Sequence, residues 1–426
     1  MLLSAWRVVP ALSAAIFGCL VLGCSGESEL TQGGTGGSGV VGPGGAGGTG
    51  AGVGTGGLGA GGAGTTTGAG AQGGAGAAGG AGAGGGGCAG SFAVGGTVKG
   101  LLGSGLVLQN NGGDDLPVGK DGPFAFPTSV PGGQGYAVTV LVHPSSPEQK
   151  CVVPNGAGLV GCEDVTGVSV ECSLIDGDGD GIPDLADPFP NDAAKPKAAA
   201  MNMVYPHTAA QLFTMNVLSY AIALVGSFHG PGYGGSMTDV AVDQFGVLYG
   251  VTFTDLYTCD PTSAECWHLA SLPQSFNGLT MVPPGTHHPF LDTLIAIANS
   301  GTWYKVTVAN GKATLAPLGQ YGQGMTSSGD AFSIMGVGTF ASVDKPGAPS
   351  DVIVSVDPMS GKVLAEVGPV SGYSSVYGLA GWSGEIYGFD ATGAVLKIDI
   401  VNGTSSLIAN KGQPWWGAGV TTRMGK

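Results

Sequence analysis

Residues 351–368 read DVIVSVDPMSGKVLAEVG and describe one structural unit, a strand, a tight turn and a second strand. Branched apolar residues fill both arms, and such residues favour β structure. Between the arms, Asp357-Pro358 opens a turn that Gly361 closes. The stretch therefore predicts a β-hairpin, and the fold prediction rests on finding this hairpin again along the chain.

Four further segments have the same shape: QLFTMNVLSYAIALVGSF (211–228), DLYTCDPTSAECWHLASL (255–272), TWYKVTVANGKATLAPLG (302–319) and AVLKIDIVNGTSSLIANKG (394–412). The residues taken as the start of each turn, Asn216, Asp260, Thr307, Asp357 and Asp399, are 44, 47, 50 and 42 residues apart. Asn-Gly at 310–311 and at 402–403 supplies the residues of a type I′ turn. A period of 40 to 50 residues with four strands in each unit is typical of a β-propeller.

A further β unit precedes each hairpin except the first, which lacks an inner strand. The last residues, WWGAGVTTR (415–423), look like an inner strand without partners. Pairing residues 415–423 with the first hairpin completes a fifth blade and hides strand edges that would otherwise pair with other chains. We predict a five-bladed propeller over residues 196–426, closed by the C-terminal strand, with a six-bladed or incomplete ring as the alternative.

Residues 88–173 have another pattern, in which short apolar runs alternate with turn residues at a spacing near ten. This spacing predicts a small β-sandwich, so the predicted class is all-β throughout the folded part. The runs GTVKGLLGSGLVLQNNGGDDLPV (96–118), YAVTVLVHP (136–144) and CVVPNGAGLVGCEDVTGVSVEC (151–172) resemble an immunoglobulin-like module of bacterial secreted proteins. The resemblance implies a spacer or adhesive role and a disulfide between Cys151 and Cys172. Cys162 departs from that module, and we expect it to pair with Cys88.

Residues 1–24, MLLSAWRVVPALSAAIFGCLVLGC, carry one charge ahead of an apolar run that is too short to span a membrane comfortably. The ending Val21-Leu22-Gly23-Cys24 resembles the lipobox of bacterial lipoproteins. The resemblance implies a signal peptide over residues 1–23, lipid on Cys24 and, with Ser25 in the next position, the outer membrane or cell surface. An ordinary signal peptide that contains a cysteine is the alternative.

Cysteine usage agrees with export. The chain has eight cysteines, and six remain once Cys19 and Cys24 are set aside with the signal. An even number in an oxidising compartment predicts three disulfides. Cys259 and Cys266 lie on the two arms of one predicted hairpin, and we expect them to bridge it.

Residues 24–87 are a Gly-rich segment; positions 33–87 contain 31 glycines in 55 residues without a strict period of three. Such a segment cannot bury enough apolar surface to fold. As a flexible coil it would span about 40 Å and, fully extended, roughly 190 Å. We interpret it as a disordered tether between the membrane and the folded part.

Residues 174–195 contain the most acidic stretch, IDGDGDGIPDLADPFPND (175–192), with six aspartates in a chain of which only 10% is charged. Counted from Asp176, acids occupy positions 1, 3, 5, 9 and 12, Gly181 occupies position 6, and the carbonyl of Ile182 occupies position 7. Oxygen ligands in this spacing suit Ca²⁺, and carboxylates this close repel one another without a cation. A merely acidic, solvated linker is the alternative.

The same stretch resembles a thrombospondin type 3 repeat. The resemblance implies Ca²⁺ held by Asp176, Asp178, Asp180, the Ile182 carbonyl and Asp187, with Asp184 as a weaker candidate. Three prolines exclude the flanking helices of an EF-hand, so we expect a structural role, stiffening the hinge between sandwich and propeller.

The net charge of −15 argues against a nucleic-acid partner, and no catalytic motif is present in the folded part. His287-His288 falls in a loop and is expected to be exposed and polar. Candidate ligand-surface residues at the propeller channel are Asp239, Asp330, Trp382, Trp415 and Trp416; of the two adjacent tryptophans, we expect one packed and one exposed.

The sequence therefore predicts a lipid-anchored surface protein that binds a glycan or a surface protein. A glycan hydrolase that uses carboxylates in the channel and a purely structural surface protein are the alternatives.

Overall fold

The structure is a computed structural model that describes residues 88–423. The predicted signal peptide, the lipidation at Cys24 and the Gly-rich tether lie outside the described residues. Residues 88–423 form thirty β-strands and no helix, and accordingly no helical segment in this range could cross a membrane. The predicted all-β class is confirmed.

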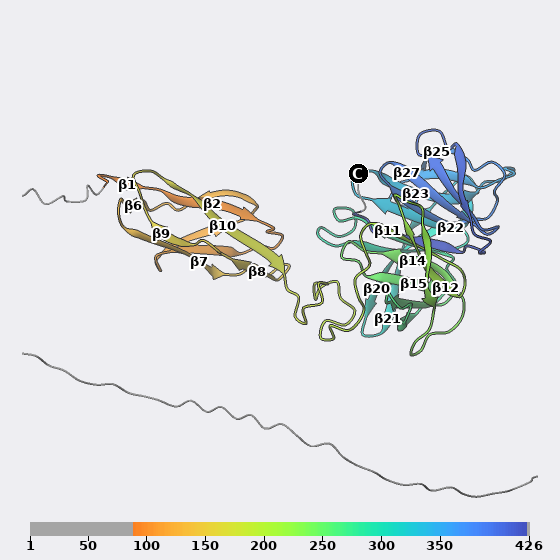
Figure 1. The fold of residues 1–426 in the computed structure, drawn as a ribbon, viewed down its shortest axis with the longest axis horizontal. Helices are drawn as coiled ribbons and strands as arrows, with labels where there is room; N and C mark the ends of the chain where they lie inside the picture. The colour runs from red at the N-terminus through yellow and green to blue at the C-terminus, as the bar shows by residue number, and fades with distance from the viewer. Residues whose placement is uncertain (1–87, 424–426) are drawn as a thin grey trace, which may run out of the picture. The chain divides into compact units, whose positions relative to one another are not determined.

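Residues 91–174 form a β-sandwich, drawn in orange to yellow-green in Figure 1. One sheet has the order β5 (Gly122–Ala125), β2 (Val94–Lys99), β10 (Val165–Leu174) and β8 (Gln149–Val152). The other has the order β4 (Asp114–Val118), β3 (Leu106–Asn110), β7 (Gly135–Val142) and β9 (Ala157–Leu159). The short strands β1 (Ser91–Phe92) and β6 (Val130–Pro131) pair with each other. Alternate residues of the strands, such as Val94, Val98, Leu106 and Leu108, are buried and make the core.

Three disulfides are present among the described cysteines. Cys151 lies opposite Cys172 in the β8–β10 ladder and is bonded to it. Cys88 is bonded to Cys162, and Cys259 to Cys266 across the β16–β17 hairpin of the propeller.

Residues 203–419 form five antiparallel sheets of four strands, and each sheet is one propeller blade. Blade 1 contains β11 (Met203–His207), β12 (Gln211–Asn216), β13 (Ile222–Ser227) and β30 (Gly417–Gly419); blade 2 contains β14 (Met237–Val242), β15 (Leu248–Thr252), β16 (Asp255–Cys259) and β17 (Cys266–Ser271). Blade 3 contains β18 (Gly278–Val282), β19 (Thr293–Ile297), β20 (Thr302–Ala309) and β21 (Lys312–Gln320). Blade 4 contains β22 (Thr326–Ile334), β23 (Gly338–Asp344), β24 (Val352–Val356) and β25 (Val363–Pro369); blade 5 contains β26 (Val376–Trp382), β27 (Glu385–Asp390), β28 (Ala394–Asp399) and β29 (Ser405–Asn410).

The five blades close into a ring. The inner strands follow one another as β30, β14, β18, β22 and β26, and β26 again contacts β30. Strand β30 pairs with β11, so the C-terminal end of the chain completes the blade that the first propeller residues begin. Five blades, the favoured prediction, are confirmed. The inner strands β14 and β18 are buried along their whole length, whereas the outer strands β21 and β29 are largely exposed.

Two turn predictions are wrong in detail. Asn310 and Gly311 both have positive φ, as a type I′ turn requires. At 402–403 only Gly403 has positive φ. There Asp399 begins a longer loop, and its side chain accepts the N–H groups of Val401 and Asn402. Thr307 does not begin a turn either. It pairs with Thr314 inside the β20–β21 ladder, which continues to Ala309.

Candidate functional sites

The aspartate loop is the first candidate site. Ligand oxygens of Asp176, Asp178 and Asp180 lie within 4.8 Å of one another. Glycine permits this compact path, since Gly179 and Gly181 both have positive φ. Main-chain N–H groups hold the carboxylates in place: Asp176 accepts from Gly179 N at 2.7 Å and from Gly181 N at 3.0 Å.

Three carboxylate oxygens in this loop are buried and have no hydrogen-bond partner: Asp178 Oδ2, Asp180 Oδ2 and Asp187 Oδ2. Asp187 as a whole is only 8% exposed. A buried carboxylate oxygen without a donor is unfavourable unless a cation or a proton meets it. These residues therefore fit a hard cation, and Ca²⁺ would supply the positive charge that offsets their repulsion.

Burial and the neighbouring charges raise the pKa values of two carboxyl groups in the loop. Burial, and then the charges of Asp178 and Asp176, raise the pKa of Asp180. Burial also raises the pKa of Asp187 to about 6, with contributions from Asp180 and Asp178. Asp184 is not among the three aspartates whose ligand oxygens lie within 4.8 Å of one another. Its Oδ1 accepts the N–H of Gly177 at 2.6 Å.

The segment that follows the loop is attached to the propeller. The ring of Phe189 packs edge-on against Trp267 of β17 at 5.7 Å, and Ala199 N donates to Gly246 O at 2.7 Å. Ile182 in the loop is fully buried. The segment that leads out of the expected hinge is therefore attached to the propeller by contacts of its own.

A pocket of about 580 Å³ opens where the inner strands begin, and we call it the mouth pocket. Aromatic side chains from three blades line it: Phe253, Tyr377 and Trp416. Its polar lining consists of amide and hydroxyl groups and one carboxylate, from Thr238, Asn277, Asn299, residues 326–328 and Asp344. Asn277 Oδ1 is buried and lacks a hydrogen-bond partner, so a polar acceptor is left available there.

Only Trp416 among the predicted ligand-surface residues lines this pocket. Trp415 is fully buried between Phe213 and Phe389, as expected for one of the two neighbours, and its Nε1 donates to Gly393 O. Trp382 is half-buried and is the last residue of β26. Tyr377, near the start of the same strand, is the residue that lines the mouth pocket.

Asp239 and Asp330 are not surface residues, since both are 0% exposed. Asp239 of β14 accepts Leu279 N of β18 at 2.7 Å. Asp330 of β22 accepts Leu379 N of β26 at 2.7 Å and Ala418 N of β30 at 3.2 Å. The two carboxylates thus satisfy main-chain donors of neighbouring inner strands.

Asp330 Oδ1 and His207 Nε2 are buried and have no hydrogen-bond partner among the described residues. Burial, and then the charge of Asp239, raise the pKa of Asp330 well above its usual range. Burial raises the pKa of Asp239 as well, opposed by His207, whose Nε2 lies 3.8 Å from Asp239 Oδ1.

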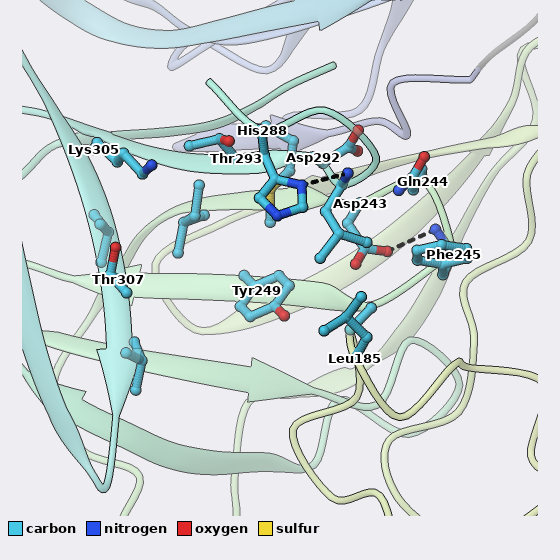
Figure 2. Close-up of a pocket in the computed structure, with 16 residues that line it drawn as sticks. Leu185, Asp243, Gln244, Phe245, Tyr249, His288, Asp292, Thr293, Lys305 and Thr307 are labelled. Carbon is cyan, nitrogen blue, oxygen red and sulfur yellow. Dashed lines mark hydrogen bonds between the residues drawn. The ribbon is translucent and has the colours of Figure 1, made fainter. Parts of the chain in front are cut away.

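A second pocket of about 350 Å³ lies where blades 2 and 3 meet residues 185–186, and we call it the loop-side pocket (Figure 2). Figure 2 shows Tyr249 on its floor and His288, Lys305 and Leu185 around it. Asp243 and Asp292 line its other end. Burial raises the pKa of Asp243 to about 6 and that of Asp292 to about 7.

The sequence prediction missed the loop-side pocket. His288 was expected to be a merely exposed residue, yet its Nδ1 accepts Leu291 N at 2.9 Å and Phe290 N at 3.2 Å, which leaves Nε2 as the protonated nitrogen. No sequence signal could have found the pocket, because its residues come from separate hairpins that only the closed ring brings together.

No protein-family model matches the chain, and no curated protein matches it significantly. Among solved structures, BamB from Moraxella catarrhalis is similar at 14% identity with a TM-score of 0.27, over 53% of this chain and 62% of that one. The computationally designed Ika8 protein is similar at 12% identity with a TM-score of 0.26, over 52% and 63% of the respective chains. The chain thus spans less than two thirds of each of these structures.

Proposed function

We propose that this protein is a lipid-anchored binding protein of the cell surface whose propeller binds glycan at the mouth pocket. The observation that carries the proposal is the composition of that pocket. Aromatic rings that can stack on a sugar face stand beside amides and hydroxyls that can bond to sugar hydroxyls. The lipobox-like residues 21–24 and the Gly-rich tether support the surface location.

Binding is favoured over hydrolysis by the state of the two channel carboxylates. A glycan hydrolase needs two carboxyl groups that reach the scissile bond from either side. Asp239 and Asp330 are fully buried, and each accepts main-chain N–H groups of neighbouring inner strands. Their geometry supports a role in bracing the inner strands.

Calcium in the aspartate loop is part of the proposal. Asp178, Asp180 and Asp187 would hold the ion through their unpartnered oxygens, together with Asp176 and the Ile182 carbonyl. The ion would neutralise the loop and fix the segment that leads into the propeller.

A glycan array tests the proposed function. The chain would start at residue 25, so that it lacks the cysteine expected to carry lipid, and would be applied in Ca²⁺. We expect binding to a defined set of glycans and its loss in Trp416→Ala, while Leu407→Ala, a change on the exposed outer strand β29, keeps it. If the array stays blank, a protein partner or a purely structural role becomes the better account.

Lipidation is tested separately. Labelled palmitate should be incorporated into the full chain expressed in a Gram-negative host and not into Cys24→Ala. Equal labelling of both proteins, or of neither, contradicts the proposed anchor.

A further inference from the structure

The loop-side pocket carries opposite charges at its two ends. Lys305 extends from β20 into the pocket (Figure 2), is half-buried, and makes no ion pair within residues 88–423. Burial, and then the charge of Lys305, lower the pKa of His288. Because His288 Nδ1 accepts main-chain N–H groups, its Nε2–H is the donor that the ring offers to this pocket. This end of the pocket is built to receive an anionic group.

The other end is acidic. Asp292 Oδ2 accepts the hydroxyl of Thr422 at 2.7 Å, but Asp292 Oδ1 is buried without a hydrogen-bond partner. Burial, and then the charges of Asp243, Asp187 and Asp292, raise the pKa of Tyr249, which lines the pocket with Asp243 and Asp292. Carboxylates beside an aromatic ring form a favourable environment for an ammonium group.

We propose that the loop-side pocket is a second binding site, for a small zwitterionic ligand that carries a carboxylate and a primary ammonium group. The carboxylate pairs with Lys305 and His288, and the ammonium group lies against Tyr249, Asp243 and Asp292. The volume of about 350 Å³ suits a ligand of amino-acid size.

The aspartate loop forms one wall of this site. Leu185 and Ala186 line the pocket, and they lie between Asp184 and Asp187 in the sequence. A cation that orders Asp187 therefore orders the wall, so that Ca²⁺ and the zwitterion strengthen each other's binding. This coupling rests on the calcium part of the proposed function, whereas the ligand class rests on the pocket's own charges.

Isothermal titration with three probes of matched length, γ-aminobutyrate, butylamine and butyrate, tests the ligand class. In Ca²⁺, γ-aminobutyrate should bind at least about tenfold more tightly than either singly charged probe. Lys305→Met and Asp292→Asn should each remove this preference, while Lys312→Met, a change in the exposed β20–β21 hairpin, retains it. Equal affinity for the three probes, or no binding at millimolar concentration, overturns the proposal.

The coupling is measured by repeating the γ-aminobutyrate titration with a chelator and with Asp178→Asn. We expect affinity to fall about tenfold in both; unchanged affinity overturns the coupling. A direct Ca²⁺ titration of the same samples separates this result from a failure of the metal site. Since the mouth pocket and its glycan probes take no part, a blank glycan array leaves this test unaffected.

Discussion

Asp239 and Asp330 have the same structural role, since each accepts main-chain N–H groups of neighbouring inner strands. Asp239 bonds blade 2 to blade 3, and Asp330 bonds blade 4 to blades 5 and 1, so each of the five inner strands takes part in one of these two sets of bonds. The sequence placed both residues on inner strands; Asp239 is the third residue of β14 and Asp330 lies in the middle of β22. It could not show that they are buried, because their burial depends on how closely the blades approach at the axis.

The raised pKa of Asp330 makes the stability of the ring depend on pH. The folded state holds the Asp330 proton more tightly than the unfolded chain, so the free energy of unfolding falls as pH rises from about 4 through the raised pKa. Asp330→Asn keeps the shape and removes the charge, and we expect it to flatten this dependence in urea unfolding measured at several pH values. Asp239, His207 and Tyr321 are the titratable groups around it. A variant with the same pH dependence as the wild type would contradict this account.

Gly417 of β30 lies against the buried side chains of His207 and Asp239. A Cβ at this position would collide with His207 Nε2 and Asp239 Oδ1, both fully buried. We therefore expect Gly417→Ala to lower the free energy of unfolding by about 2 to 3 kcal/mol. Gly234→Ala is the matched control, since a Cβ there meets nothing within 4 Å. Thermal unfolding of both variants decides the matter, and equal stability would show that β30 does not pack as described.

At the scale of elements, the positions of the hairpins could be predicted from the sequence, whereas the conformation of their turns could be predicted only in part. Apolar alternation and the recurring Asp or Asn located the hairpins, and Asp260 and Asp357 cap their turns as the pattern implies. The predictions for Thr307 and for Asn402-Gly403 are wrong for different reasons. The β20–β21 ladder continues beyond Thr307, and the Asp399 side chain caps the loop at 402–403. Preferences of single dipeptides reveal neither the length of a ladder nor a cap from a neighbouring residue.

The aspartate loop was likewise predictable from spacing, but its attachment to the propeller was not, since it depends on contacts with residues as distant as Gly246 and Trp267. We expect Asp178→Asn to weaken Ca²⁺ binding at least tenfold, roughly 1.4 kcal/mol or more. Asp192→Asn, in the same acidic stretch but paired with Lys195 outside the cluster, should leave affinity unchanged. Calorimetric titration compares them, and equal affinities of the two variants would rule out the assigned ligands.

At the scale of the whole molecule, closure of the ring by β30 creates the mouth pocket. Trp416 reaches that pocket only because β30 lies beside β14 and β26, far from its own position in the sequence. The sequence could predict closure from an inner strand without partners. The sequence could not predict which aromatic side chains meet in the mouth pocket. Phe253 and Tyr377 belong to different repeats, and the rotation of one blade relative to the next is set only when the ring closes.

The most direct test of the glycan-binding claim is the dissociation constant for the best glycan of the array, measured in Ca²⁺ for the wild type, Tyr377→Ala and Trp416→Ala. Loss of one stacking ring should weaken binding by about 1 to 3 kcal/mol, or roughly 5- to 150-fold. Leu407→Ala, the control on the outer strand, should bind as the wild type does. Dissociation constants that stay at the wild-type value in both aromatic variants would contradict the assignment of the mouth pocket as the glycan site.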